Sequence, residues 1–418
     1  MRLQTCLLMV FVLLGLAGHA MGDQGWQDEA EVHGFLEQRA GSRTVDDPYQ
    51  EGLSIMETRF QLDGSYAPDW GQLRLKADTL IDGVEGTGRC LLRELNLQLS
   101  PLSQVDIKVG RQALTWGTGD LLFINDMFPK DWVSFFIGRD LEYLKAPSDA
   151  IKINSFLGRW NLTLVYTPQF DPDMYIDGSR ISYWNGYLGR IAGKDAIIKA
   201  DRPDKWFSDD EWAVRFAGRV GRYDLALYGY WGYWKSPGGI DPTTGMATFP
   251  RLDVYGASIE GPFAKGLGNI ELGWYRSVHD LDGYDPTVNN SELRYLVGYR
   301  QEIWRDLNAG MQYYIEQILD YDGYMAGVPS EMARDRIRQV LTANISSLWM
   351  NQNLVCSFFL YYSPSDEDAY LRPNIRLKAS DHMTFDLGAN IFTGPQRHTF
   401  FGQFRYDTNI YAGLRLSF

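Results

Sequence analysis

The chain has 418 residues, of which 14% are aromatic, and a formal net charge of −13 at pH 7. This acidic balance argues against a nucleic-acid partner, because phosphate binding needs a basic surface. Beyond the first 22 residues no apolar run reaches the roughly 20 residues of a transmembrane helix, so a helical membrane protein is excluded. A β-barrel is not excluded, because only every second residue of its strands faces lipid.

The N-terminal segment is typical of an export signal. Arg2 precedes an apolar run over residues 7–17, and small residues between positions 18 and 22 offer cleavage points. An apolar run of about ten residues has the length of a signal-peptide core and is too short to span a bilayer. We therefore expect residues 1–22 to form a signal peptide and residues 23–418 to form one domain, since no linker divides them.

Residues 71–81 give the clearest strand pattern, with a period of two. Apolar residues alternate there with Gln72, Arg74, Lys76 and Asp78. A face with these polar groups can sit neither in lipid nor in a dry core, so we expect it to face water inside a barrel. The alternation recurs in about eighteen segments: 31–40, 53–62, 71–81, 90–99, 105–114, 148–157, 159–167, 212–220, 223–233, 252–260, 268–276, 291–300, 307–317, 337–346, 354–363, 370–379, 382–392 and 408–418.

The connections between these segments alternate in length, as they do in bacterial outer-membrane barrels. The long ones are 115–147, 168–211, 234–251, 277–290 and 318–336, and short turns lie between them. We predict an all-β fold, a transmembrane antiparallel up-and-down β-barrel of about 18 strands, with 16 as the alternative count. A soluble β-sandwich or propeller is less favoured, because neither needs this alternation of loop lengths.

The long connection 115–147 is too apolar for a solvated loop. We expect it to fold inward and pack on the barrel wall as a constriction loop, with Gly117 and Gly119 permitting a tight reversal. The alternative is an outward hairpin extension of two strands. Arg111 and Arg139 are candidates to pair with a loop carboxylate and pin the loop. The predicted constriction residues are Arg111, Gln112, Trp116, Asp120, Asp126, Asp131 and Arg139.

The same segment carries a family resemblance. Gly110-Arg111-Gln112 is followed by Trp116-Gly117, and an opening strand contains Gly34-Phe35-Leu36-Glu37. With the barrel plan, these elements resemble the porin-like outer-membrane proteins related to the alginate-export family. The resemblance implies an outer-membrane channel in which the Gly-Arg-Gln strand leads into a loop at the channel. It does not reach the loops that would fix a substrate, so alginate itself is not implied.

The last segment alternates to the final residue and ends on the aromatic Phe418. This ending looks like the closing strand of a bacterial outer-membrane barrel. We expect the protein in the outer membrane, with lipid and lipopolysaccharide as surroundings and the barrel-assembly machinery as a partner of this strand. The sequence does not distinguish a monomer from a trimer.

The charges expected on the inner face are the best indication of cargo, because bases exceed acids there. A basic ring selects anions by raising their local concentration, whereas a wall of neutralised pairs, such as Arg74 with Glu57 or Glu94, selects nothing. Both interpretations stay open. The predicted pore-lining residues are Arg59, Arg74, Lys76, Glu94, Lys108, Arg294, Arg300, Arg372, Arg376, Lys378 and Arg415.

The function that follows is a channel or porin that passes or exports a small-molecule or polysaccharide solute by diffusion, an anion being one option. The first alternative is a barrel that holds a partner protein in its lumen for secretion or electron transfer. A second, less favoured, is an outer-membrane hydrolase, but no histidine sits in a nucleophile motif, so no enzyme is expected. We expect no metal and no cofactor, and free thiols at Cys90 and Cys356, which lie far apart in the strand order.

Overall fold

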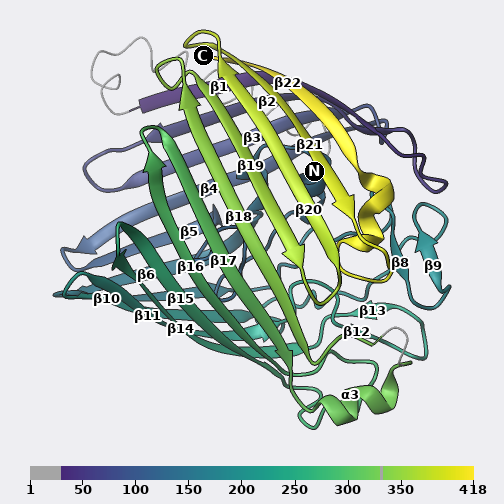
Figure 1. Cartoon of the computed structure of the whole chain (residues 1–418). Helices are drawn as coiled ribbons and strands as arrows, with labels where there is room; N and C mark the ends of the chain where they lie inside the picture. Colours follow the sequence, from purple (N-terminus) through teal and green to yellow (C-terminus); the bar gives the residue numbers. More distant parts are fainter. Residues whose placement is uncertain (1–29, 330–332) are drawn as a thin grey trace.

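The computed structural model describes residues 30–329 and 333–418, so the expected signal peptide lies outside the described residues. Eighteen strands of the described chain form one antiparallel sheet that closes on itself (Figure 1). They are β1 (Ala30–Arg43), β2 (Leu53–Tyr66), β3 (Gln72–Asp82), β4 (Thr87–Leu102), β5 (Val105–Ala113), β6 (Pro147–Leu157), β7 (Trp160–Thr167), β10 (Glu211–Val220), β11 (Tyr223–Tyr233), β14 (Arg251–Phe263), β15 (Gly266–Ser277), β16 (Glu292–Trp304), β17 (Leu307–Ile318), β18 (Ile337–Trp349), β19 (Leu354–Ser363), β20 (Asp368–Lys378), β21 (Met383–Thr393) and β22 (Asn409–Ser417).

Each barrel strand pairs with its neighbours in sequence, and β1 pairs with β22 to close the sheet. The closing register runs from Phe35 opposite Ser417 to Arg43 opposite Asn409. Phe418 continues this seam, because its backbone exchanges hydrogen bonds of 3.0 Å with Gly34. The predicted strand count and up-and-down order are therefore confirmed.

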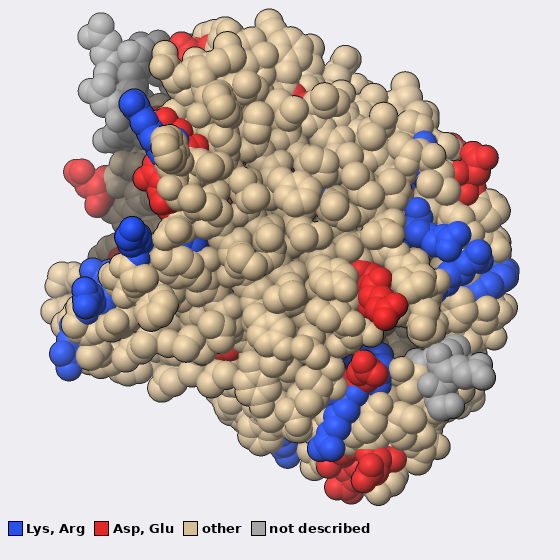
Figure 2. Space-filling model, viewed as in Figure 1, with Lys and Arg blue, Asp and Glu red and all other residues tan. Residues whose placement is uncertain are grey.

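The two faces of the sheet have opposite polarity. On β3, Ile81 is 61% exposed on the outside, whereas its neighbour Leu80 and the inward Asp78 are buried. On the face shown in Figure 2 the outer wall is a largely uncharged band, and charged groups gather toward the two ends of the barrel. Because an unpaired sheet edge cannot lie in hydrocarbon, closure and this apolar exterior place the barrel in an outer membrane.

Aromatic side chains form a row on the outer wall near the long loops. Tyr166 lies opposite Trp212, Trp212 opposite Trp231, and Tyr255 opposite Trp274 on neighbouring strands. Rings at this level sit where lipid meets water, as in the aromatic girdles of outer-membrane barrels.

The long connections gather at one end of the barrel and carry the short elements (Figure 1). These are α2 (Trp132–Ile137), η1 (Leu141–Leu144), β8 (Tyr183–Asn185), β9 (Arg190–Ala192), β12 (Gly239–Ile240), β13 (Ala247–Thr248), α3 (Tyr321–Gly327) and η2 (Gly402–Asp407). No helix in the described residues is both long and apolar enough to cross a bilayer.

One cysteine expectation is wrong. Cys356 is a free thiol, as expected, but Cys90 is disulfide-bonded. The sequence argument concerned only a pairing of Cys90 with Cys356, and the structure does not contain that pairing.

Candidate functional site: a loop across the barrel interior

The connection between β5 and β6, residues 114–146, folds into the barrel and is called the inner loop below. Its side chains Ile124, Phe128, Phe135, Phe136 and Ile137 are each no more than 5% exposed. They pack against inward residues of the wall in one apolar cluster. The predicted inward fold is therefore confirmed, and the outward hairpin is excluded.

Glycines let the inner loop turn and approach the wall. Gly117 has φ of 85°, a left-handed conformation that favours glycine, whereas Gly119 does not have a positive φ. Gly138 ends α2 with φ of 90°, and a Cβ there would lie 2.2 Å from the ring of Tyr411 on β22. Asp131 begins α2, where its side chain accepts a 2.7 Å hydrogen bond from the Ser134 backbone N–H.

A buried carboxylate of β15 holds the first part of the inner loop. Glu271 is 1% exposed and accepts backbone N–H hydrogen bonds from Thr118, Gly119 and Asn125 at 2.8–3.2 Å. The Thr118 hydroxyl and the Asn125 amide donate to it as well. No cation pairs with Glu271 among the described residues, so these donors alone compensate its buried charge.

The next part of the inner loop contacts β17, β18 and β19. The Asp120 backbone N–H donates to Gln312 at 2.7 Å, and its carboxylate accepts from Asn344 at 2.6 Å. The Tyr361 hydroxyl donates to the Leu121 carbonyl at 2.7 Å. The side chains that β17, β18 and β19 contribute to these bonds are thus all uncharged.

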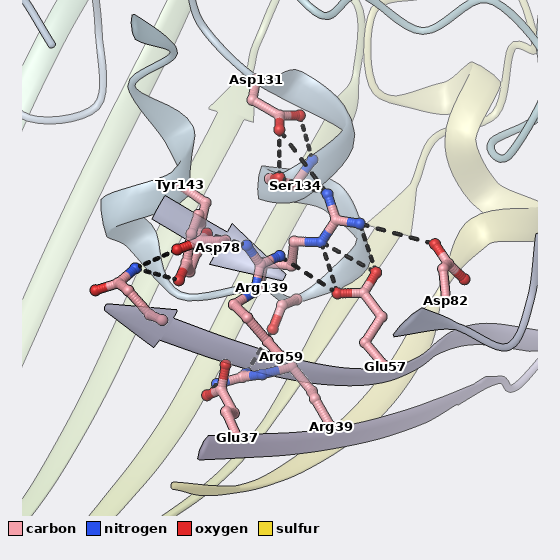
Figure 3. Close-up of polar contacts among 12 residues, drawn as sticks. Glu37, Arg39, Glu57, Arg59, Asp78, Asp82, Asp131, Ser134, Arg139 and Tyr143 are labelled. Carbon is pink, nitrogen blue, oxygen red and sulfur yellow. Dashed lines mark hydrogen bonds and ion pairs between the residues drawn. The ribbon is translucent and has the colours of Figure 1, made fainter. Parts of the chain in front are cut away.

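The opposite wall holds the inner loop with ion pairs (Figure 3). Arg139 donates to both Glu57 carboxylate oxygens of β2, at 2.5–3.1 Å, and to the Ser134 hydroxyl at 2.8 Å. Arg180, from the 168–210 connection, also pairs with Glu57, at 3.3 Å. Arg39 of β1 donates to the Gly138 carbonyl at 2.6 Å. We call the Arg139 and Glu57 pair the latch.

The structure contains only some of the ion pairs that were predicted for Arg111 and Arg139. Arg139 lies 3.9 Å from Asp131, but its main partner is Glu57. Arg111 does not pair with a loop carboxylate: it pairs with Asp149 of β6 at 2.7 Å, because both side chains stand at opposite register positions. Asp126 bonds to residues of the inner loop itself, namely the Thr115 hydroxyl and Lys130.

Two other predicted loop residues have local roles. Gln112 donates to the carbonyl of Ala150 at 3.0 Å and is 1% exposed. Trp116 packs edge-on against Phe128, with ring centroids 4.9 Å apart, and reaches Tyr228 on β11. Both residues therefore fasten the root of the inner loop to the wall.

Most of the predicted pore-lining bases face carboxylates. The inner loop supplies some of these partners, since Asp140 pairs with Arg376 at 2.7 Å and with Arg415 at 3.5 Å. Although burial acts to raise it, these two guanidinium groups hold the pKa of Asp140 below its usual range. The remaining pairs are Arg59 with Asp78, Arg74 with Asp63 and Glu94, Lys76 with Glu142, Arg294 with Glu292, Arg300 with Glu260, and Lys378 with Asp381.

Arg372 differs from these residues because its contact is with a carbonyl. Its guanidinium donates to the Arg139 carbonyl at 3.3 Å and lies 4.9 Å from the ring centre of Phe135. Arg372 thus supports the inner loop through α2.

Three bases stand apart from this pattern. Lys108 lies directly opposite Lys152, and Arg215 lies two strands further along the wall. No carboxylate of the described residues lies within ion-pair distance of Lys152 or Arg215, and Lys108 is 4.0 Å from Glu94. Lys152 and Arg215 therefore carry positive charge on the inner wall that no nearby carboxylate of the described residues compensates. We call Lys108, Lys152 and Arg215 the basic cluster; like charges directly opposite each other, as in Lys108 and Lys152, are destabilising.

A cavity of about 970 Å³ lies between the inner loop and the long connections. Parts of the inner loop form its floor, and the 168–210, 234–250, 364–367 and 394–408 connections contribute to its sides. We call this space the vestibule. A solute that crosses the barrel from the long-loop end enters it before reaching the inner loop.

Sequence patterns missed several residues of this site. Arg93 is an extra residue on β4, because Glu94 pairs with Lys76 while Leu92 pairs with Ala77. This bulge turns both Arg93 and Glu94 inward, and Arg93 donates to the carbonyls of Glu142 and Lys145. Glu271 was also missed, since a period-two pattern assigns a face but does not identify the partner across the lumen. Arg180 was missed because it lies in a long connection without such a pattern.

No known family model matches the chain, and no curated protein matches it in sequence. Solved structures share its fold. OccAB2 of Acinetobacter baumannii is 8% identical with a TM-score of 0.57, over 95% of this chain and 99% of that chain. OccAB3 of the same organism is 8% identical with a TM-score of 0.55, over 94% and 99%.

OccK2 of Pseudomonas aeruginosa, solved in complex with glucuronate, is 11% identical with a TM-score of 0.54, over 94% of this chain and 99% of that chain. These neighbours are outer-membrane porins. At such low identity the likeness concerns the fold. The chain therefore has the 18-stranded barrel fold of an outer-membrane porin.

Proposed function

We propose that the protein is an outer-membrane channel that passes small solutes by diffusion. One observation carries this proposal: a closed barrel with an apolar exterior encloses a charged interior that the inner loop narrows from wall to wall. The porin neighbours support the same function and a role without covalent chemistry. An inner loop that occupies the lumen also leaves little room for a partner protein, which argues against the scaffold alternative.

The finer parts of the proposal concern family and surroundings. The Gly-Arg-Gln and Trp-Gly elements support a relation to the alginate-export family, and Gln112 and Trp116 fix the root of the inner loop. Lipopolysaccharide at the aromatic row and the barrel-assembly machinery at β22 are the partners we propose.

We attribute a preference for anions to the basic cluster of Lys108, Lys152 and Arg215. Most of the other predicted inward bases are paired with carboxylates, so those pairs add little net charge. Arg372 keeps its charge, but it is buried and bound to a carbonyl of the inner loop. Lys152 and Arg215 have no carboxylate of the described residues within ion-pair distance, and with Lys108 beside them they raise the local anion concentration and lower the barrier to anion entry. The resulting solute class is small anions, with neutral solutes passing more slowly.

Planar bilayer recordings test the channel and its selectivity together. The wild-type barrel should conduct ions, and a silent barrel would overturn the channel. The variant K152Q/R215Q should lower the anion-to-cation permeability ratio by about threefold or more, because it removes the uncompensated charges.

The matched control is R219Q/R300Q, which removes two bases that are paired with Asp224 and Glu260 and stand more than half exposed. Its permeability ratio should stay near the wild-type value. Equal ratios in all three proteins would remove the basic cluster as the selective element.

A further inference from the structure

The vestibule has an apolar floor, although charged residues line its sides. Leu121, Leu122, Phe123 and Trp132 of the inner loop line it, and all four are only partly buried. Keeping such groups exposed to water costs free energy that polar residues would not. The floor therefore offers apolar surface on which the apolar face of a solute can lie.

The rings of the floor are held in place before any solute arrives. The Trp132 indole N–H donates to Asp173 at 3.0 Å, and Asp173 also accepts the Lys130 backbone N–H at 2.7 Å. Phe123 meets Trp132 nearly edge-on, with ring centroids 6.0 Å apart, and the Lys130 ammonium lies 4.7 Å from the Phe123 ring centre. A preorganised aromatic platform binds a ring with little loss of side-chain entropy.

The charged groups around the vestibule come in pairs. Lys130 pairs with Asp126, Arg294 with Glu292, Arg334 with Glu316, and Arg338 with Asp366. Each pair places hydrogen-bond donors beside acceptors. Neighbouring hydroxyl groups of a solute can use both, because a hydroxyl group donates one hydrogen bond and accepts others. Seven carboxylates and five bases are among the described lining residues, so the vestibule itself offers an anion no net attraction.

We propose that the vestibule is a sugar-binding site in which a pyranose ring stacks on the floor and its hydroxyl groups bond to the paired charges. This inference rests on the proposed channel and names what the channel captures first. The cavity volume of about 970 Å³ lies at the upper end of small-molecule sites, which fits a short oligosaccharide. Binding in the vestibule then depends on the pyranose ring of the solute, whereas the charge of the solute matters at the basic cluster.

Calorimetric titration of the detergent-solubilised barrel tests the site without requiring conduction. Maltose and glucuronate should bind with affinities within about threefold of each other, and both more tightly than benzoate. The variant W132A should weaken maltose binding about tenfold or more, and W132F, which keeps a ring, should weaken it less. The control L141A changes an exposed apolar residue of the same loop that does not line the vestibule, and it should bind as the wild type does.

Three results would overturn the inference: no sugar binding, tighter binding of benzoate than of maltose, or equal maltose affinity in W132A and the wild type. The last would mean that the floor only packs the loop. Bilayer recordings on the same samples separate the two proposals. A conducting barrel that binds no sugar would refute the site alone, and a sugar-binding barrel that never conducts would refute the channel alone.

Discussion

Glu271 secures the first part of the inner loop through hydrogen bonds alone. Its carboxylate accepts hydrogen bonds from three backbone N–H groups without a cation beside it. In the variant E271Q one carboxylate oxygen is replaced by an NH2 group, which cannot accept a hydrogen bond from the backbone N–H that it faces. We therefore expect a loss of about 1–3 kcal/mol in the free energy of unfolding. Urea unfolding in detergent, followed by tryptophan fluorescence, measures this change.

The variant E260Q is the matched control for Glu271. Glu260 is a partly exposed carboxylate whose partner is the exposed Arg300. Its loss should cost less than about 1 kcal/mol, as for other surface pairs. Equal costs in E260Q and E271Q would show that the bonds of Glu271 do not secure the inner loop.

Residue-level sequence reasoning identified faces more reliably than partners. It assigned Arg74, Lys76 and Arg415 to the interior, where the structure places them in ion pairs. It could not find that Asp140 of the inner loop neutralises Arg376 and Arg415, because those contacts join segments more than 230 positions apart. A cross-lumen contact depends on barrel curvature, which no local pattern contains.

At the scale of elements, the inner loop is attached to two walls by different interactions. The latch and Arg39 hold it on β1 and β2, while Glu271, Gln312 and Asn344 hold it on β15, β17 and β18. The sequence predicted the inward fold from the loop's apolar content. It did not predict the attachments, because each depends on which strand lies opposite.

A double-mutant cycle on the latch tests this attachment. The variants E57Q and R139Q should each lower the free energy of unfolding by about 2–4 kcal/mol, since each removes the main partner of a buried charge. The double variant should cost less than the sum, by about 1–3 kcal/mol. Single-channel records should show more current fluctuation in all three, because the inner loop then loses its main ion pair with β2.

The variant R74Q serves as the control for the cycle. Arg74 is a paired base like Arg139, but it lies on the wall, its side chain is 42% exposed and its partners are not in the inner loop. Its unfolding free energy should change by less than about 1 kcal/mol, and its current should stay steady. Additive costs in the cycle would mean that Arg139 and Glu57 do not act as a pair.

At the scale of the whole molecule, the barrel closes without help from the inner loop. The β1 and β22 seam and the eighteen-strand ladder involve only neighbouring strands, so the strand count followed from the period-two pattern and the alternating loop lengths. The interior did not follow as directly, because the apolar cluster of the inner loop combines side chains from many strands around the wall.

Deleting residues 118–140 should therefore leave the barrel folded and enlarge its passage. The remaining residues still join β5 to β6, which are neighbouring strands, and conductance should rise about twofold or more as the constriction is lost. Heat-modified mobility on gels checks the fold, and bilayer recordings measure conductance. Deleting the exposed hairpin tip 186–189 is the control and should change neither. A folded 118–140 deletion with wild-type conductance would mean that the inner loop does not limit passage, and that the narrowest point lies elsewhere on the wall.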